Sequence, residues 1–231
     1  MSAHPRRLFA EWLGTAALLA IVVGSGHMGE ILAQGNAAIA LLANSIATGL
    51  GLWVLIELFG PICGAHFNPV VSLAFAWCGE MRWRDCAMYI CAQIAGAVCG
   101  VVLAHLMFGL TPIAVGTRVR TGLDQGLSEA VATTGLVLTI LLGRRSRPQA
   151  VPALVGAYIA SAYWFTASTS FANPAVTLAR SLTTTFAGIR PQDVAAFVAA
   201  QCVGMMIAML ALRLLEPRAT DTAHGERYRG R

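Results

Sequence analysis

The sequence predicts an all-α membrane protein with six transmembrane helices and two re-entrant half-helices, arranged as an inverted repeat. The first observation is composition: 57% of the 231 residues are hydrophobic and only 12% are charged, whereas soluble domains carry about 25% charged residues. The second is a series of apolar runs with room for six spans of about 20 residues each. The third is a short motif that occurs twice in the chain.

The repeated motif begins with Asn-Pro. Residues 68–74 read Asn-Pro-Val-Val-Ser-Leu-Ala, and residues 173–179 read Asn-Pro-Ala-Val-Thr-Leu-Ala. Asn is a preferred N-cap, and Pro is favoured at the first helical position because its missing N–H would have no partner there. Each copy therefore predicts a loop followed by a short helix, over about Asn68–Trp77 and Asn173–Leu182. One copy alone would indicate an ordinary helix start, but two copies in apolar sequence indicate a shared function.

The six spans follow from the apolar runs and the charged breaks between them. They cover about Leu8–Met28, Ala37–Phe59, Cys86–Phe108, Gly126–Leu142, Val151–Thr166 and Val194–Leu215. No cleaved signal peptide is expected, because the first apolar run is long enough to span the membrane. Residues 1–6 are expected to form a cytoplasmic tail, residues 7–215 a channel domain, and residues 216–231 a polar, disordered tail.

The repeat extends beyond the Asn-Pro motifs. The pattern Glu11-x3-Thr15 recurs as Glu129-x3-Thr133, and Gln93-x2-Gly96 recurs as Gln201-x2-Gly204. The two halves, about 7–108 and 126–215, each hold three spans and one half-helix. Because three is odd, the second half must be inverted, so the half-helices enter from opposite faces and meet near the bilayer middle.

Arginine placement gives the orientation. The positive-inside rule places both termini in the cytoplasm, because only Arg118, Arg120 and Arg190 then lie in outside loops. The inside segments hold Arg6, Arg7, Arg82, Arg84, Arg144, Arg145, Arg147, Arg213, Arg218, Arg227, Arg229 and Arg231. The net charge of +5 comes from these loops and tails, so it does not indicate nucleic-acid binding.

Two loops at membrane depth indicate a channel. Non-helical backbone is tolerated there only where protein covers it or water reaches it. Carbonyl groups of Gly64, Ala65, Ser170 and Phe171 would accept hydrogen bonds from permeating molecules. The half-helix N-termini carry partial positive charge, and with the two Asn amides they favour a neutral hydroxyl oxygen and repel cations. The sequence therefore predicts a passive channel for small uncharged solutes.

The two Asn-Pro motifs, the segment Gly64-Ala65-His66-Phe67-Asn68-Pro69 and the paired Glu and Gln residues resemble the major intrinsic protein family of aquaporins and aquaglyceroporins. The resemblance covers about Arg7–Leu215 and implies one pore per subunit in a homotetramer. The motifs Asn68-Pro69-Val70 and Asn173-Pro174-Ala175 would lie in the pore. Val70 stands where the family usually has Ala, and Val176 stands where it usually has Arg. Arg180, one helical turn further on, does not match that position.

Counting from the motifs without gaps assigns the family's outer constriction to Thr48, Ser161, Ser170 and Val176. These small neutral residues imply a wide opening. The set, and the run Ala162–Phe171, are similar to bacterial members associated with arsenic resistance, which implies passage of As(OH)3 through the inner (plasma) membrane of a bacterium. Methylated arsenicals, boric acid, glycerol and water fit the same geometry, so a general glycerol and water channel is the alternative.

Polar residues at membrane depth can be interpreted as structural or as functional. Acidic side chains are costly there; Glu11 and Glu129, with Gln93 and Gln201, are expected to brace the loops, and ion coupling is the alternative. His66 lines the pore or braces the loop.

The sequence supports other classes of function less well than it supports a channel. An ion-coupled secondary transporter would also have inverted repeats. The chain shows no arrangement of catalytic residues and no metal-type cysteine spacing, so an enzyme, a cofactor and a metal site are not expected.

Overall fold

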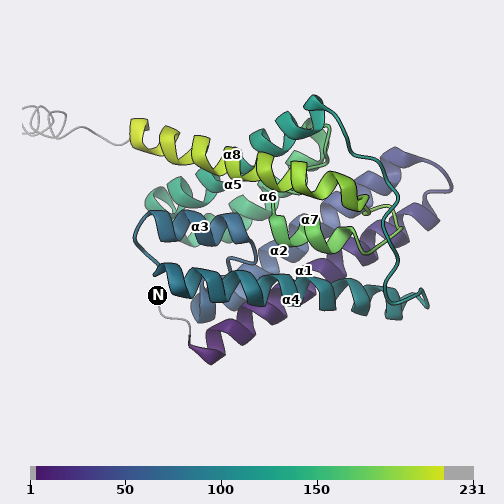
Figure 1. The fold of residues 1–231 in the computed structure, drawn as a ribbon, viewed down its shortest axis with the longest axis horizontal. Coiled ribbons are helices and arrows are strands. Elements are labelled where there is room, and N and C mark those ends of the chain that lie inside the picture. The colour runs from purple at the N-terminus through teal and green to yellow at the C-terminus, as the bar shows by residue number, and fades with distance from the viewer. Residues whose placement is uncertain (1–3, 216–231) are drawn as a thin grey trace, which may run out of the picture.

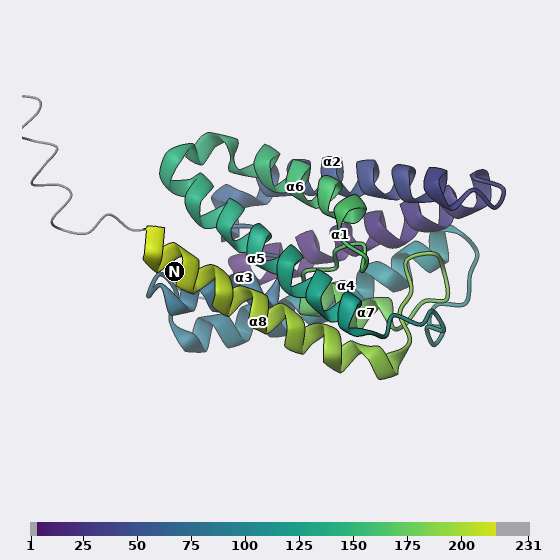
Figure 2. The same ribbon diagram turned by 90° about the horizontal axis from the view of Figure 1, so that it is seen from above.

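The computed structural model describes residues 4–215, and within this range the ordered elements are all helices. The predicted tail 216–231 and residues 1–3 of the other tail lie outside the described residues. Figures 1 and 2 show the long helices running along the length of the molecule, with short helices α3 and α7 between them. The helices are α1 (Pro5–Leu32), α2 (Ala37–Cys63), α3 (Pro69–Trp77), α4 (Trp83–Met107), α5 (Leu123–Ser146), α6 (Val151–Phe165), α7 (Pro174–Arg180) and α8 (Pro191–Leu215), with a 3-10 turn at Pro148–Ala150.

Five helices, namely α1, α2, α4, α5 and α8, are long and apolar enough to cross a membrane. The sixth predicted span is α6, which has only 15 residues and follows directly on the 3-10 turn. Four helices begin three residues before their apolar runs. In α4, α5 and α8 the added first turn contains an acidic residue, which is favourable at a helix N-terminus because of the helix dipole.

The same packing scheme occurs in both halves of the chain. Helix α1 packs against α2 and α4, and helix α5 correspondingly packs against α6 and α8. Contacts between α2 and α6 join the halves on one side. Each half-helix contacts both α4 and α8, and α3 also contacts α7. The two half-helices therefore lie in the middle of the structure, where both halves surround them.

Glycines allow the closest helix pairs to approach. A Cβ atom on Gly96 of α4 would lie 2.2 Å from the carbonyl oxygen of Trp12 in α1. A Cβ atom on Gly204 of α8 would lie 2.4 Å from the carbonyl oxygen of Ala130 in α5. Small residues at such positions let helix backbones pack tightly inside a membrane. The glycines that correspond in the sequence repeat therefore occupy corresponding helix contacts.

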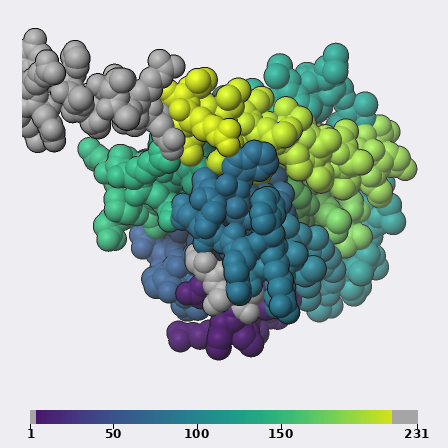
Figure 3. Space-filling model, turned by 60° about the vertical axis from the view of Figure 1, so that its left-hand side comes forward, coloured from purple at the N-terminus to yellow at the C-terminus, as the bar shows by residue number. Residues whose placement is uncertain are grey.

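The outer surface is apolar. Large hydrophobic side chains are exposed on every long helix, including Phe9, Leu58, Leu106, Leu127 and Leu210. Exposed apolar side chains on all of these helices fit contact with lipid. Figure 3 views the end where α1 begins and α8 ends, with α3 and the start of α4 between them.

Replacing Gly96 with Ala is expected to force α1 and α4 apart. Overpacking of this kind costs about 1–3 kcal/mol, so the thermal unfolding midpoint of the detergent-solubilised protein should fall. Gly126→Ala is the matched control, because nothing lies within 4 Å of a Cβ atom at that helical position. Equal midpoints for the two variants would contradict the close α1–α4 contact.

Candidate functional site

The two Asn-Pro motifs meet at the centre of the structure. Asn68 is the N-cap of α3, and its Oδ1 accepts a hydrogen bond from the N–H of Val70 at 3.1 Å. Asn173 is the N-cap of α7, and its Oδ1 accepts from the N–H groups of Ala175 and Val176 at 3.0 and 3.3 Å. Pro69 and Pro174 are the first helical residues.

The amide nitrogen of each Asn reaches the loop of the other half. Asn68 Nδ2 donates to the carbonyl oxygen of Ala172 at 2.8 Å, and Asn173 Nδ2 donates to the carbonyl oxygen of Phe67 at 2.8 Å. Each Asn side chain thus caps its own half-helix and holds the loop that precedes the other one. An amide nitrogen has two N–H groups, so each Asn keeps a second donor beyond this bond.

Both loops have an unusual backbone. Ala65 and Phe67 have φ values of 48° each, and Ser170 and Ala172 have values of 49° and 47°. Positive φ is uncommon and costly for residues other than glycine, and it persists only where surrounding contacts impose it. The same alternation in both loops shows that the two copies of the motif fold alike.

A buried glutamate holds each loop. Glu11 Oε1 and Oε2 accept from the N–H groups of His66 and Phe67 at 2.9 and 2.8 Å. Gln93 Nε2 donates to Glu11 Oε2 at 2.8 Å and to the hydroxyl of Ser72 at 3.0 Å. These contacts tie α1 and α4 to the first loop and to α3.

The second half repeats the arrangement. Glu129 accepts from the N–H groups of Phe171 and Ala172 at 2.8 and 2.9 Å, and from the hydroxyl of Ser168 at 2.6 Å. Gln201 Nε2 donates to Glu129 Oε2 at 2.6 Å and to Thr177 at 2.8 Å. Neither glutamate lines the central cavity.

One cavity of about 440 Å³ passes both asparagines. Glu57 of α2 and Arg144 of α5 line one end of the cavity. Val176 and Arg180 of α7 line the opposite end. The predicted pore-lining residues that border it are Gly64, Ala65, His66, Asn68, Phe171 and Asn173. Pro69, Val70, Pro174 and Ala175 do not border it, and Val71 does.

His66 was expected either to line the pore or to brace the first loop, and its contacts fit both roles. Its Nδ1 lies 3.0 Å from the hydroxyl of Ser72, which also accepts from Gln93. Its Nε2 is buried without a hydrogen-bond partner among the described residues. Because His66 also lines the cavity, one ring nitrogen braces the loop while the same side chain borders the conduit.

The structure brings together three of the four predicted constriction residues. Thr48, Ser170 and Val176 all line the cavity. The assignment of Ser161 is wrong, because it is exposed and its hydroxyl donates to the carbonyl oxygen of Tyr158 at 2.7 Å. Helix α6 lines the cavity with residues four apart, Val155, Ile159 and Tyr163, and a residue two positions from these points to the opposite side.

Arg180 is a cavity residue that sequence reasoning set aside. Its side chain is only 2% exposed, and it lines the same cavity as Val176. Its Nε donates to the carbonyl oxygen of Ala187, and its Cζ lies 3.4 Å from the centre of the Phe171 ring. The available signal was its spacing, since residues four apart on a helix share a face.

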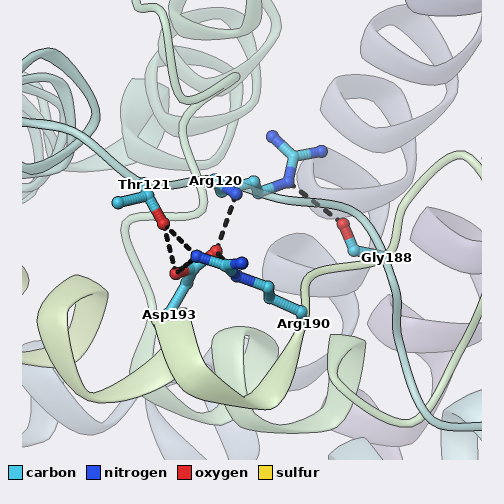
Figure 4. A network of polar contacts seen from close by, with 5 residues as sticks. All are labelled: Arg120, Thr121, Gly188, Arg190 and Asp193. Atoms are coloured by element: carbon cyan, nitrogen blue, oxygen red, sulfur yellow. Dashed lines mark hydrogen bonds and ion pairs between the residues drawn. The ribbon is translucent and has the colours of Figure 1, made fainter.

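A network of polar contacts ties the connection between the halves to the start of α8 (Figure 4). Asp193 accepts from the backbone N–H of Arg120 at 2.7 Å, from Thr121 at 2.5 Å and from Arg190 Nε at 2.8 Å. Arg120 Nε also donates to the carbonyl oxygen of Gly188 at 3.0 Å. These contacts fix the long loop over the α7 end of the molecule.

Arg120 and Arg180 both lie beside Phe171. The Cζ of Arg120 is 4.8 Å from the ring centre. Burial, followed by the positive charge of Arg180, lowers the pKa of Arg120 to about 9, which leaves Arg120 charged at neutral pH. No group of His, Cys, Asp or Glu side chains suited to a metal ion occurs within residues 4–215.

Comparison with known proteins agrees with this geometry. The chain is 58% identical over 213 residues to aquaglyceroporin AqpS of Rhizobium meliloti (strain 1021), covering 92% of this chain and 91% of that protein. It is 31% identical over 182 residues to aquaporin NIP2-3 of Zea mays, covering 75% and 59%. The structure of the aquaglyceroporin from Plasmodium falciparum matches with a TM-score of 0.70 at 18% identity, covering 88% of this chain and 93% of that chain.

The family model for the major intrinsic proteins matches residues 2–165, which is more than half of the chain. The solved structure supports the predicted fold, and the sequence relative supports the predicted family. Members of this family are channels and not enzymes. The chain therefore belongs to the major intrinsic protein family and has the aquaporin fold.

Proposed function

We propose that this aquaglyceroporin-type channel passes small uncharged hydroxylated solutes, with As(OH)3 as its main solute and with glycerol and water also permeating. The observation that carries the proposal is the uncharged set Thr48, Ser170 and Val176 along one cavity with both Asn-Pro motifs. Side chains this small leave room for a solute wider than water. A general glycerol and water channel is the second candidate, favoured by the name of the Rhizobium relative.

Transport would proceed by exchange of hydrogen bonds. The second N–H of each of Asn68 and Asn173 donates to a solute oxygen, because the first is used across the loops. Carbonyl groups of the loops accept from the solute hydroxyls. The N-termini of α3 and α7 add partial positive charge at the same place, so a neutral oxygen is stabilised and a cation is repelled.

The hydrogen bonds of Glu11 and Glu129 to the loops argue against an ion-coupled transporter. A proton-coupling site needs an acidic group beside the substrate, and neither Glu11 nor Glu129 lines the cavity. The acidic residue that does line it, Glu57, belongs to the end away from α7, and the ring of His66 is engaged with Ser72. Both carboxyl groups are instead engaged with loop N–H groups. We assign these residues, with Gln93 and Gln201, to bracing the loops.

The proposed setting is the inner membrane of a bacterium, with both termini in the cytoplasm. The beginnings of α1 and α4 and the ends of α5 and α8 lie at one end of the molecule (Figure 1). Arginines gather in these segments, which fits the positive-inside rule. A homotetramer with one pore per subunit is the proposed assembly.

Val176→Arg is expected to narrow the pore, because a long charged side chain would replace a small apolar one at the cavity wall. Glycerol and arsenite permeability of proteoliposomes should fall about tenfold, which corresponds to ~1.4 kcal/mol of added barrier. Stopped-flow light scattering measures glycerol, and the arsenic content of the vesicles measures arsenite.

Val176→Leu is the control for that substitution, since it adds bulk without charge. We expect a smaller loss with Leu than with Arg. If Val176→Arg leaves both permeabilities unchanged, the assignment of this residue to the constriction fails. If only glycerol and water cross the wild-type membrane, the second candidate replaces the first.

Glu129→Gln is expected to destabilise the protein. The variant puts an NH2 group where four donors now converge on a carboxyl group, and an unsatisfied buried donor costs about 1–3 kcal/mol. The thermal midpoint should fall, and the remaining flux should stay independent of the proton gradient. Asp124→Asn, at an exposed position that does not line the cavity, is the control. A stable Glu129→Gln protein that loses gradient-driven uptake would support the transporter instead.

A further inference from the structure

We propose that Arg180 supplies the fixed positive charge with which this pore rejects cations, in place of residue 176. The inference rests on the proposed function as a pore for uncharged solutes and names the residue that makes it selective. It separates two properties that a single arginine at position 176 would combine, namely the width of the pore and its charge.

The position of Arg180 places its charge beside the conduit. Arg180 is the last residue of α7, one turn beyond Val176, and both side chains line the same cavity. The other charged residues that line this cavity are Glu57 and Arg144, which belong to its opposite end. A cation that travels along the cavity past Val176 therefore meets the charge of Arg180.

The contacts of Arg180 hold the guanidinium group to one side. Its Cζ lies 3.4 Å from the centre of the Phe171 ring, and its Nε donates to the carbonyl oxygen of Ala187. Phe171 is itself fixed, because its N–H donates to Glu129 and its ring contacts Phe197 at 5.1 Å between centroids. The side chain therefore stacks on the ring, and the uncharged residues Thr48, Ser170 and Val176 still set the width.

Two polar atoms at this end have free hydrogen-bonding capacity. Arg180 Nη1 and Ser170 Oγ are both buried and have no hydrogen-bond partner among residues 4–215. Both residues line the cavity. A buried charged donor without a partner is costly, which fits a position where permeating molecules supply the partner. The chemistry suits the oxygen atom of a neutral hydroxylated solute.

The surrounding charges leave this end positive. Arg120 lies on the same ring as Arg180, with its Cζ 4.8 Å from the Phe171 centre. The neighbouring acids are Glu129, whose carboxyl oxygens are engaged by loop N–H groups and by Gln201, and Asp193, which is paired with Arg190. Charges in a site of low dielectric act strongly on an ion that enters it. Cations and hydronium are therefore excluded here without narrowing the pore.

The test compares Arg180→Gln with the wild type in proteoliposomes. Leakage of Na⁺ and H⁺ is measured with ion-sensitive dyes under a fixed diffusion potential, and glycerol permeability is measured by stopped flow. Removing the charge should raise the ratio of ion leak to glycerol permeability about tenfold. Arg180→Lys, which keeps the charge, should remain tight. Arg84→Gln, at an exposed position that does not line the cavity, is the matched control.

A folded Arg180→Gln protein that leaks no more than the wild type would overturn the proposal, and so would an Arg180→Lys protein that leaks as much as Arg180→Gln. If Arg180→Gln does not fold, Phe171→Leu provides the second test.

Without the Phe171 ring, the guanidinium of Arg180 is free to swing into the conduit. Glycerol permeability should therefore fall about threefold or more, while the barrier to ions remains. Unchanged glycerol permeability in Phe171→Leu would also overturn the proposal. A wild-type protein that passes no solute would refute the proposed function alone, because the leak comparison does not depend on solute flux.

Discussion

The structure depends on giving every polar group of two irregular loops a partner inside a membrane. Lipid offers no hydrogen bonds, so backbone that leaves the helix must be satisfied by protein or by molecules in a cavity. Glu11 and Glu129 take the loop N–H groups, and Asn68 and Asn173 take one carbonyl of the opposite loop each. The remaining polar groups of the loops are thereby left for permeating molecules, which makes the same constraint the basis of function.

Close helix packing supports this centre. Gln93 meets Glu11 because α1 lies directly against α4, and Gln201 meets Glu129 because α5 lies directly against α8. Gly96 and Gly204 permit both contacts, since any side chain there would meet a backbone carbonyl. The glutamines one turn earlier on α4 and α8 complete the bracing. Sequence positions that repeat between the halves thus carry the same physical task in each.

Local signals predicted much of this architecture. The Asn-Pro motifs predicted both half-helices, because N-cap and first-turn preferences act within a few residues. The bound glutamates were also expected, since an acid at membrane depth needs partners. The assignment of Ser161 to the constriction failed because it counted residues without gaps across a loop. No local rule sets the path of that loop. Arg180 was set aside because it does not match the family's arginine position. The direction of its side chain depends on Phe171 and Ala187, whose placement is tertiary.

The exchange of amide bonds between the loops has a consequence for biogenesis. The carbonyl of Phe67 and the amide of Asn173 are 106 residues apart in the chain, and the reciprocal pair is 104 apart. The ribosome must therefore deliver the first part of the second half, up to residue 173, before the two loops can exchange these bonds. Until then the carbonyl of Phe67 lacks the partner that it has in the folded protein, so this contact between the halves forms late in synthesis.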